Sequence, residues 1–303
     1  WAIIGTWLLP CIGDGFMDRE DIRLGIRNIK NLPTLPVIVS RILEVADDSG
    51  SSANELAELV ARDMSVSAKV LNLANSAFYG FSRRITTIPQ AVVVLGFDTV
   101  RSLALSVSVF ETLKNDTGEV SFDREAFWIH SIGCGTASRL IAKELKYRDT
   151  GTFFVAGLLH DLGKVILDTH FSEQYTEVVE EMVEEERSAL DAETDILDID
   201  HAEVGAWLAA RWKFPEILVT PIAAHHNLMA AEEEFIKEAV IVHLANILTK
   251  RAGIGLCYES TVPAPSSEVQ SELKLSKEQI AKIEQDLLGE RDQINEFFSY
   301  LTG

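Results

Sequence analysis

Apolar residues recur at helical spacing along nearly the whole chain, and this periodicity is the feature that most restricts the possible folds. Apolar positions three and four residues apart line one face of a helix. No pair of alternating segments is joined by an Asn-Gly or Asp-Gly turn, as a β-hairpin would be. Val92–Val94 is the one place where a short strand fits on propensity, and we favour helix there because turn residues are missing on both sides. The periodicity therefore predicts an all-α fold.

Two breaks in the periodicity divide the chain. Turn-forming residues at 114–118 separate an N-terminal helical subdomain, residues 17–114, from a second helical subdomain, residues 119–255. Prolines and serines predict a loop at the start of the C-terminal part, residues 256–303. A last helix then follows, capped by Ser276 with a glutamine three positions later.

The negative charge is concentrated in the second half of the chain. The net charge is −20, yet residues 17–114 contain 11 basic and 11 acidic side chains, whereas residues 115–303 contain 16 basic and 35 acidic ones. Such a surface repels phosphates and anionic lipids, so we expect neither a nucleic acid nor a membrane as partner. We interpret the acidic run at residues 177–200 as a solvated helix face and a loop rather than a cation site.

The start of the chain is a largely apolar stretch, but its 12 residues are too few to span a bilayer and follow no basic region. We expect residues 1–16 to be a tail or a segment introduced by cloning, with Met17 as a natural starting point. The three cysteines are far apart and form no CxxC pair, which indicates a reducing compartment. We therefore expect a cytoplasmic protein.

Residues 55–75 have the spacing of a helix–turn–helix, with the turn at residues 63–65. The helix that would read DNA contains a single cation, Lys69. Recognition helices usually bring several cationic or amide side chains to phosphates and bases. DNA binding is therefore the least favoured of the functions considered.

All seven histidines lie in the second subdomain. Five of them stand in apolar helical segments, and one is followed directly by Asp161. A single buried histidine is usually a hydrogen-bonded core residue, but five with a carboxylate would each need a partner. Helical bundles can bring imidazoles and carboxylates together around a metal ion, although no HExxH or CxxC motif is present. The five are His130, His160, His201, His225 and His226.

Several motifs, in order along the chain, resemble the HD-related output domain (HDOD) family of bacterial signalling proteins, within the HD superfamily. The resemblance covers about residues 24–252 and rests on Leu32–Pro36, Asn75–Gly80, Ile88–Ala91 with Leu95-Gly96, Trp128–Ser131, Gly157–Lys164, His201–Gly205, Trp212–Pro215 and His225-His226.

This resemblance implies an N-terminal helical subdomain packed against an HD-like helical bundle. It also implies a signal-transduction output or regulatory module that acts by contact with a partner protein, and we favour a non-catalytic role. The alternative is a metal-dependent phosphohydrolase that acts on a nucleotide or a cyclic dinucleotide. The resemblance identifies neither the partner nor the oligomeric state.

The resemblance also implies a set of metal ligands. Active HD enzymes use a first histidine, a His-Asp pair and a final aspartate, with further histidines where two metals bind. In this chain the final position falls at Asn246, a neutral and weaker ligand. Lys164 would contact a phosphate or stabilise a helix C-terminus. The remaining set would hold Fe, Mn or Zn, or would be a vestigial site without a cofactor. Its members are His130, His160, Asp161, His201, His225 and His226.

Overall fold

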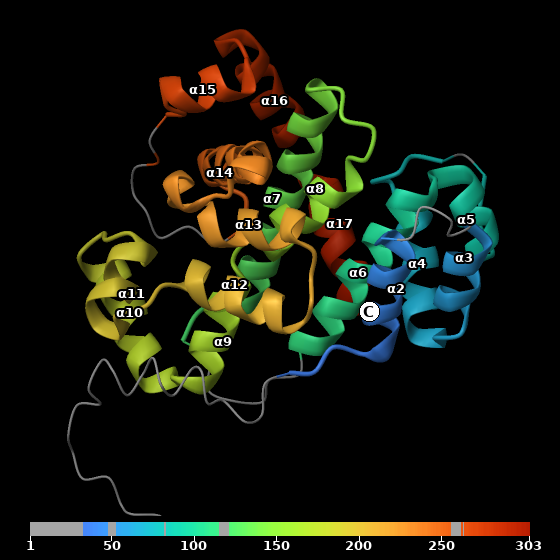
Figure 1. Cartoon of the computed structure of the whole chain (residues 1–303), viewed down its shortest axis with the longest axis horizontal. Helices are drawn as coiled ribbons and strands as arrows, with labels where there is room; N and C mark the ends of the chain where they lie inside the picture. Colours follow the sequence, from blue (N-terminus) through green and yellow to red (C-terminus); the bar gives the residue numbers. More distant parts are fainter. Residues whose placement is uncertain (1–32, 48–52, 82, 115–120, 256–261, 263) are drawn as a thin grey trace, which may run out of the picture.

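The computed structural model describes residues 33–47, 53–81, 83–114, 121–255, 262 and 264–303. Every regular element in these ranges is a helix, which confirms the predicted all-α fold (Figure 1). None of the described helices is both long and apolar enough to cross a membrane. The expected tail at residues 1–16, the start at Met17 and most of the expected boundary at residues 114–118 lie outside the described residues.

The N-terminal part is a group of five described helices. Residues 92–94 are helical, as the sequence predicts, and Gly96 ends their helix with a φ of 90°, a conformation that favours glycine. Earlier in the chain, Asp63 caps the helix that begins at Met64 by accepting hydrogen bonds from the backbone amides of Ser65 and Val66. The helices are α2 (Val37–Asp47), α3 (Ala53–Ala61), α4 (Met64–Ala74), α5 (Ile88–Leu95) and α6 (Phe97–Leu113).

Lys69 lies on α4, the helix that would read DNA in a helix–turn–helix. Its side chain is buried and pairs with Glu111 on α6, at 2.9 Å between Nζ and Oε1. Its ammonium group also donates a hydrogen bond to the carbonyl of Leu301 at the other end of the chain. Lys69 therefore connects three helices of the core and does not face solvent.

The second part is a bundle built around its longest helix, α7, which packs against α8, α14, α16 and α17. Around it, α12 packs on both α9 and α13, and α10 packs on α11 (Figure 1). The helices are α7 (Arg124–Glu144), α8 (Gly151–Leu159), α9 (Leu162–His170), α10 (Ser172–Glu184), α11 (Ala189–Leu197), α12 (His201–Arg211), α13 (Glu216–Ala224) and α14 (Ile236–Arg251), with short 3-10 turns η1 (Leu228–Ala230) and η2 (Glu233–Phe235).

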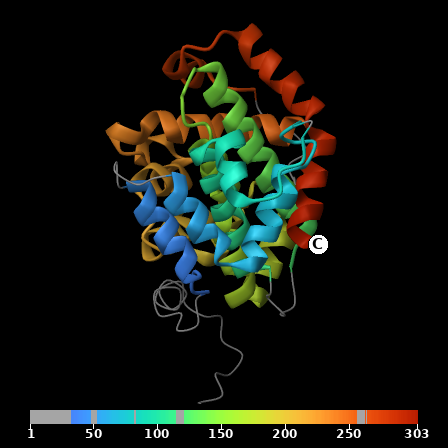
Figure 2. The same cartoon turned by 90° about the vertical axis from the view of Figure 1, so that its right-hand side faces the viewer.

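The C-terminal part differs from the expectation of one loop and one helix. Residues 267–273 form a helix, α15 (Ser267–Leu273), because the Ser266 hydroxyl caps it by accepting a hydrogen bond from the Val269 amide. The capping box predicted at Ser276 begins α16 (Lys277–Gly289), and a separate helix, α17 (Arg291–Thr302), follows it. These helices run along one edge of the molecule (Figure 2), where α17 contacts both α7 and α4. The end of the chain thus connects the two groups of helices.

Candidate metal centre

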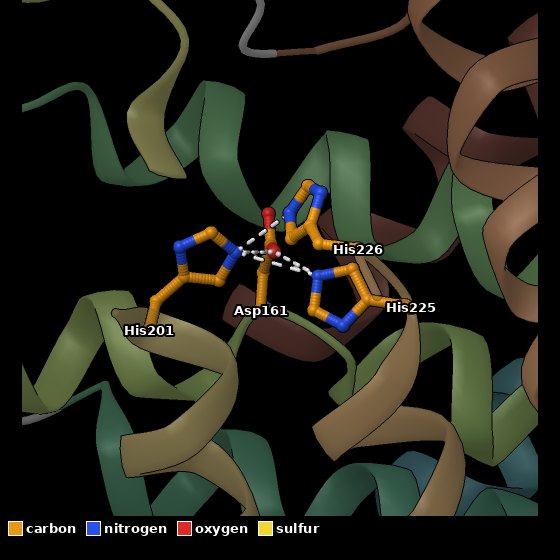
Figure 3. A group of neighbouring side chains, drawn as sticks. All are labelled: Asp161, His201, His225 and His226. Atoms are coloured by element: carbon orange, nitrogen blue, oxygen red, sulfur yellow. Dashed lines mark hydrogen bonds and ion pairs between the residues drawn. The ribbon is translucent and has the colours of Figure 1, made fainter. Parts of the chain in front are cut away.

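The six residues implied as ligands converge from four places in the second bundle. His130 lies in α7, and His160 and Asp161 form the junction between α8 and α9. His201 is the first residue of α12, and His225 and His226 directly follow α13. Figure 3 shows the imidazoles of His201, His225 and His226 turned toward the carboxylate of Asp161.

The inner group consists of Asp161, His201, His225 and His226. The Nε2 atom of His201 lies 3.1 Å from Asp161 Oδ1, 3.3 Å from His225 Nε2 and 3.0 Å from His226 Nε2. His225 Nε2 is 3.4 Å from the same carboxylate oxygen. Bonds of about 2.1 Å at ordinary coordination angles separate neighbouring ligand atoms by about 3.0–3.4 Å. The spacing therefore fits the coordination sphere of one metal ion.

A second group shares Asp161 with the first. The ligand atoms of His130, His160 and Asp161 lie within 4.8 Å of one another, with His160 Nε2 3.3 Å from Asp161 Oδ1. Asp161 is the single carboxylate in both groups. The donor set thus has room for one ion, or for two with Asp161 between them.

Backbone carbonyls orient three of the histidines. Nδ1 of His160 lies 2.7 Å from the carbonyl oxygen of Gly157, and Nδ1 of His225 lies 2.8 Å from that of Ile222. His130 makes the corresponding contact with Ile254 at 3.3 Å. Because a carbonyl only accepts, each Nδ1 donates, and in the neutral ring the Nε2 lone pair is directed into the centre.

The charge states of these rings suit metal binding. Burial lowers the pKa of His130 to about 4 and lowers the pKa of His160, His225 and His226 as well, so these rings are neutral at pH 7. The Nε2 atoms of His130 and His160 are buried and have no hydrogen-bond partner among the described residues. Buried acceptors without donors are costly, and a cation between them would remove that cost. The residues therefore fit a metal ion.

His201 differs from the other histidines because a carboxylate lies on its far side. Burial acts to lower its pKa, but the negative charges of Glu193 and Asp161 outweigh burial and raise the pKa to about 9. Without a metal, His201 therefore holds a proton on each nitrogen. A metal at Nε2 would displace one of these protons, so metal binding and protonation compete at this atom.

Glu193 is a site residue that the sequence analysis missed. Its side chain is fully buried and accepts hydrogen bonds from the backbone amide of His201 at 2.8 Å, from His201 Nδ1 at 2.6 Å and from the Tyr175 hydroxyl at 2.9 Å. The interpretation of residues 177–200 as a solvated face and loop is therefore wrong for this residue. The available signal was its place on the buried face of α11, beside Ala189, Ala192 and Leu197.

Two glycines allow neighbouring segments to approach the backbone of His201 and of His130 closely. A Cβ atom added at Gly163 on α9 would lie 1.9 Å from the backbone oxygen of His201. A Cβ atom added at Gly255 would lie 2.2 Å from the backbone nitrogen of His130, and Gly255 also has a φ of +72°. Side chains at either position would push His201 or His130 out of place.

Lys164 and Asn246 have more limited roles than the histidines. Lys164 forms an ion pair with Asp161, at 2.7 Å between Nζ and Oδ2. Burial acts to raise the pKa of Asp161, but its contact with His160 and the positive charges of Lys164 and His201 hold it well below its usual value, so the carboxylate is ionised. Asn246 is buried on α14, and its Oδ1 has no hydrogen-bond partner among the described residues. The asparagine leaves Asp161 as the only anion of the two groups.

Comparison with known proteins identifies the family. The model of the HDOD domain matches residues 32–228. The chain belongs to the HDOD family. This confirms the resemblance inferred from the motifs, and the HDOD match contains all six candidate ligands.

Similar proteins share the fold across most of the chain. An uncharacterized protein of Treponema pallidum (strain Nichols) is 28% identical over 220 residues, which span 72% of this chain and 42% of that protein, less than half of its length. An HDOD domain protein of unknown function from Geobacter sulfurreducens is 29% identical, with a TM-score of 0.75 and coverage of 92% and 95% of the two chains. A protein named as a candidate phosphohydrolase from Shewanella amazonensis SB2B is 25% identical, with a TM-score of 0.71 and coverage of 92% and 97%.

Proposed function

We propose that this HDOD chain is a non-catalytic output or regulatory module of signal transduction that acts by contact with a partner protein. We further propose that its His/Asp centre holds one or two divalent ions of Fe, Mn or Zn through the six residues His130, His160, Asp161, His201, His225 and His226. Such an ion supplies positive charge that neutralises Asp161 and joins α7, α12 and the ends of α8 and α13. Membership of the HDOD family supports the signalling role.

Burial of the centre is the observation that carries the non-catalytic role. His160, His201 and His225 are 0% exposed, Asp161 is 1% exposed and His130 is 2% exposed. A metal-dependent hydrolase needs an open coordination position that water and substrate can reach. His226 is partly exposed, so a phosphate ester would meet this imidazole first and would have to displace packed residues before it met the other ligand atoms.

The charges around the centre also support a non-catalytic role. The ammonium group of Lys164, the residue that would contact a phosphate, is bound to Asp161. Asn246 replaces the final carboxylate, which leaves a bound metal with fewer anionic ligands. The surrounding half of the chain is strongly acidic and would repel an anionic substrate.

The alternative is a phosphohydrolase of the HD type that acts on a nucleotide or a cyclic dinucleotide. Its specific support is the Lys164 side chain, which is 14% exposed beside Asp161 and would meet a substrate first if the centre opened. The similarity to the candidate phosphohydrolase of Shewanella amazonensis SB2B agrees with this alternative.

Elemental analysis tests the metal centre. The wild-type protein, purified without chelator, is compared with a His160→Ala/Asp161→Ala double variant and with a His226→Ala variant, each checked for folding by circular dichroism. We expect one or two equivalents of Fe, Mn or Zn in the wild type and none in a folded double variant. A metal-free wild type would contradict the proposed centre.

A hydrolysis assay then separates the two functions. The metal-loaded wild type and the double variant are incubated with p-nitrophenyl phosphate, mononucleotides and a cyclic dinucleotide in the presence of Mn²⁺ or Fe²⁺. We expect no turnover above that of the double variant. If the wild type hydrolysed a substrate that the double variant did not, the proposed non-catalytic function would be wrong and the phosphohydrolase function would be supported.

A further inference from the structure

A separate cavity of about 420 Å³ lies where the N-terminal helices, the second bundle and the C-terminal helices meet. Its walls come from the segment at residues 78–81, from α6, α7 and α8, and from Glu290 between α16 and α17. None of the six residues of the metal centre lines it. Its volume lies within the range of about 300–1,000 Å³ that is typical of small-molecule sites, and such sites often occur where domains meet.

Two cations of α7 line this cavity. Arg139 and Lys143 are four residues apart and thus lie on one face of the helix. Glu290 is the only carboxylate among the lining residues that the structure describes, so the wall has a net positive charge.

These two cations differ from several arginines of the bundle, which pair with carboxylates. Arg124 pairs with Asp168, and Arg251 pairs with Glu284. Within the described part of the chain, neither Arg139 nor Lys143 has a carboxylate within 4.0 Å. Because residues 115–303 contain 35 acidic and only 16 basic side chains, a cavity at which two cations outnumber one carboxylate provides local attraction for an anion.

Aromatic rings hold one of the cations and line the same cavity. The guanidinium carbon of Arg139 lies 4.0 Å from the ring centroid of Phe78 and 5.9 Å from that of Tyr79. This stacking orients the planar group and leaves its edge N–H donors available to a ligand. Phe81, another lining residue, is 46% exposed, so its ring is accessible to a ligand.

Tyr79 also lines the cavity and carries a hydroxyl group. Burial raises the pKa of Tyr79 to about 12, although the nearby Arg139 acts to lower it. The phenol is therefore protonated at physiological pH and can donate a hydrogen bond to an anionic oxygen.

We propose that this cavity binds a small molecule of the nucleotide class. Arg139 and Lys143 contact its phosphate, since guanidinium and ammonium groups are the usual phosphate ligands of proteins. Phe81 provides a face on which the base stacks. A ligand here contacts all three groups of helices at once, so its binding holds them in one arrangement, as a regulatory ligand of a signalling module would.

Titration calorimetry with defined probes tests this proposal. The probes are AMP, GMP, CMP and UMP, with inorganic phosphate as a probe that lacks a base. The variants are Arg139→Gln, Arg139→Lys, Lys143→Gln and Phe81→Ala, and the matched control is Lys237→Gln, an exposed lysine of α14 outside the cavity. Thermal unfolding and metal content are measured on the same samples, so that failure of this site is distinguished from failure of the metal centre.

We expect at least one mononucleotide to bind the wild type, and phosphate alone to bind at least about tenfold more weakly. Arg139→Gln and Lys143→Gln should each weaken nucleotide binding by at least about tenfold, whereas Lys237→Gln should leave it unchanged. Phe81→Ala should weaken nucleotide binding but not phosphate binding, and Arg139→Lys should retain part of the affinity. If Arg139→Gln does not fold, the exposed Lys143 and Phe81 variants decide the result.

Three outcomes would overturn the proposal. One is the absence of binding by all four mononucleotides up to about 1 mM. Another is phosphate binding as tight as nucleotide binding, which would mean that the aromatic wall recognises no base. The third is nucleotide binding that survives loss of Lys143 and Phe81, which would place the ligand elsewhere.

Discussion

The helices α6 and α7 both bury polar side chains, but they satisfy them by different means. On α6, the hydroxyls of Ser102, Ser106 and Ser108 each donate to the backbone carbonyl four residues earlier. On α7, His130 reaches outside its own helix, to the carbonyl of Ile254 and toward His160. Polar burial in α6 is therefore complete within one helix, whereas in the metal centre it depends on four separate places in the chain.

This difference is the reason for proposing a cation in the second bundle. A hydroxyl both donates and accepts, so a serine can be satisfied by its own helix. Neutral imidazoles whose Nδ1 atoms already donate present only acceptors to one another. The three serines of α6 are therefore satisfied within their own helix, but the converging histidines require a proton or a metal ion among them.

The largest expected effect comes from Gly163→Ala. The added Cβ would lie 1.9 Å from the backbone oxygen of His201, so α9 and α12 would have to separate. We expect the free energy of unfolding to fall by about 4 kcal/mol or more, with loss of bound metal. Chemical denaturation and elemental analysis measure the two effects.

The matched control for this glycine is Gly289→Ala. An added Cβ at Gly289 meets nothing within 4 Å, and we expect the stability to change by less than about 1 kcal/mol. Equal losses of stability in the two variants would show that close approach of α9 and α12 is not what the centre depends on.

Metal removal should affect the two parts of the molecule differently. A ligand that binds only the folded state at about a thousandfold above its Kd stabilises that state by about 4 kcal/mol. We expect chelation to increase hydrogen exchange in α7, α9 and α12 while exchange in α3 and α4 stays nearly constant. A uniform increase across all helices would contradict the contrast between the two parts.

Glu193→Gln should lower metal affinity by about 10–100-fold, because the carboxylate orients His201 and balances its charge. Competitive metal titration measures the affinity. Tyr175→Phe removes one hydrogen bond to the same carboxylate and should have a much smaller effect. Glu177→Gln, an exposed residue of the same acidic run, is the charge-matched control. If Glu193→Gln and Glu177→Gln lowered the metal affinity equally, Glu193 would contribute only its negative charge and would not orient His201.

The smallest effect is expected from Ser106→Ala on α6. The serine hydroxyl bonds only to the carbonyl of Ser102 in its own helix, which keeps its backbone hydrogen bond without it. We expect a change in unfolding free energy below about 1 kcal/mol and unchanged metal content. A loss of more than about 2 kcal/mol would mean that buried polar groups in the two parts are equally critical.

Much of the candidate site could be predicted because its residues occur in recognisable motifs. His160 and Asp161 are adjacent, and His225 and His226 form a pair, so their patterns survive in a single sequence. Glu193 could not be found in this way, because it stands among ten other acidic residues between 177 and 200. Only its burial against His201 and Tyr175 distinguishes it from its neighbours.

The two cations of the proposed nucleotide cavity could not be recognised as site residues from the sequence either. Arg139 and Lys143 look like ordinary surface residues of an amphipathic helix. Their distinction is that the described structure brings aromatic rings, rather than carboxylates, beside the guanidinium group. Which partner a long side chain meets is decided by elements far away in the chain.

The sequence by itself determined the helical class and the positions of most helices, because helical periodicity and capping are local properties of the chain. The candidate ligands followed from the resemblance of its motifs to the HDOD family. Only the tertiary structure decided that ligand atoms from α12, the α8–α9 junction and the end of α13 lie within 3.4 Å of one another. It also decided that five of the six candidate ligands are buried and that His226 is partly exposed. The physical reason is that both properties depend on how helices pack, and close packing at Gly163 and Gly255 involves residues that are distant in sequence.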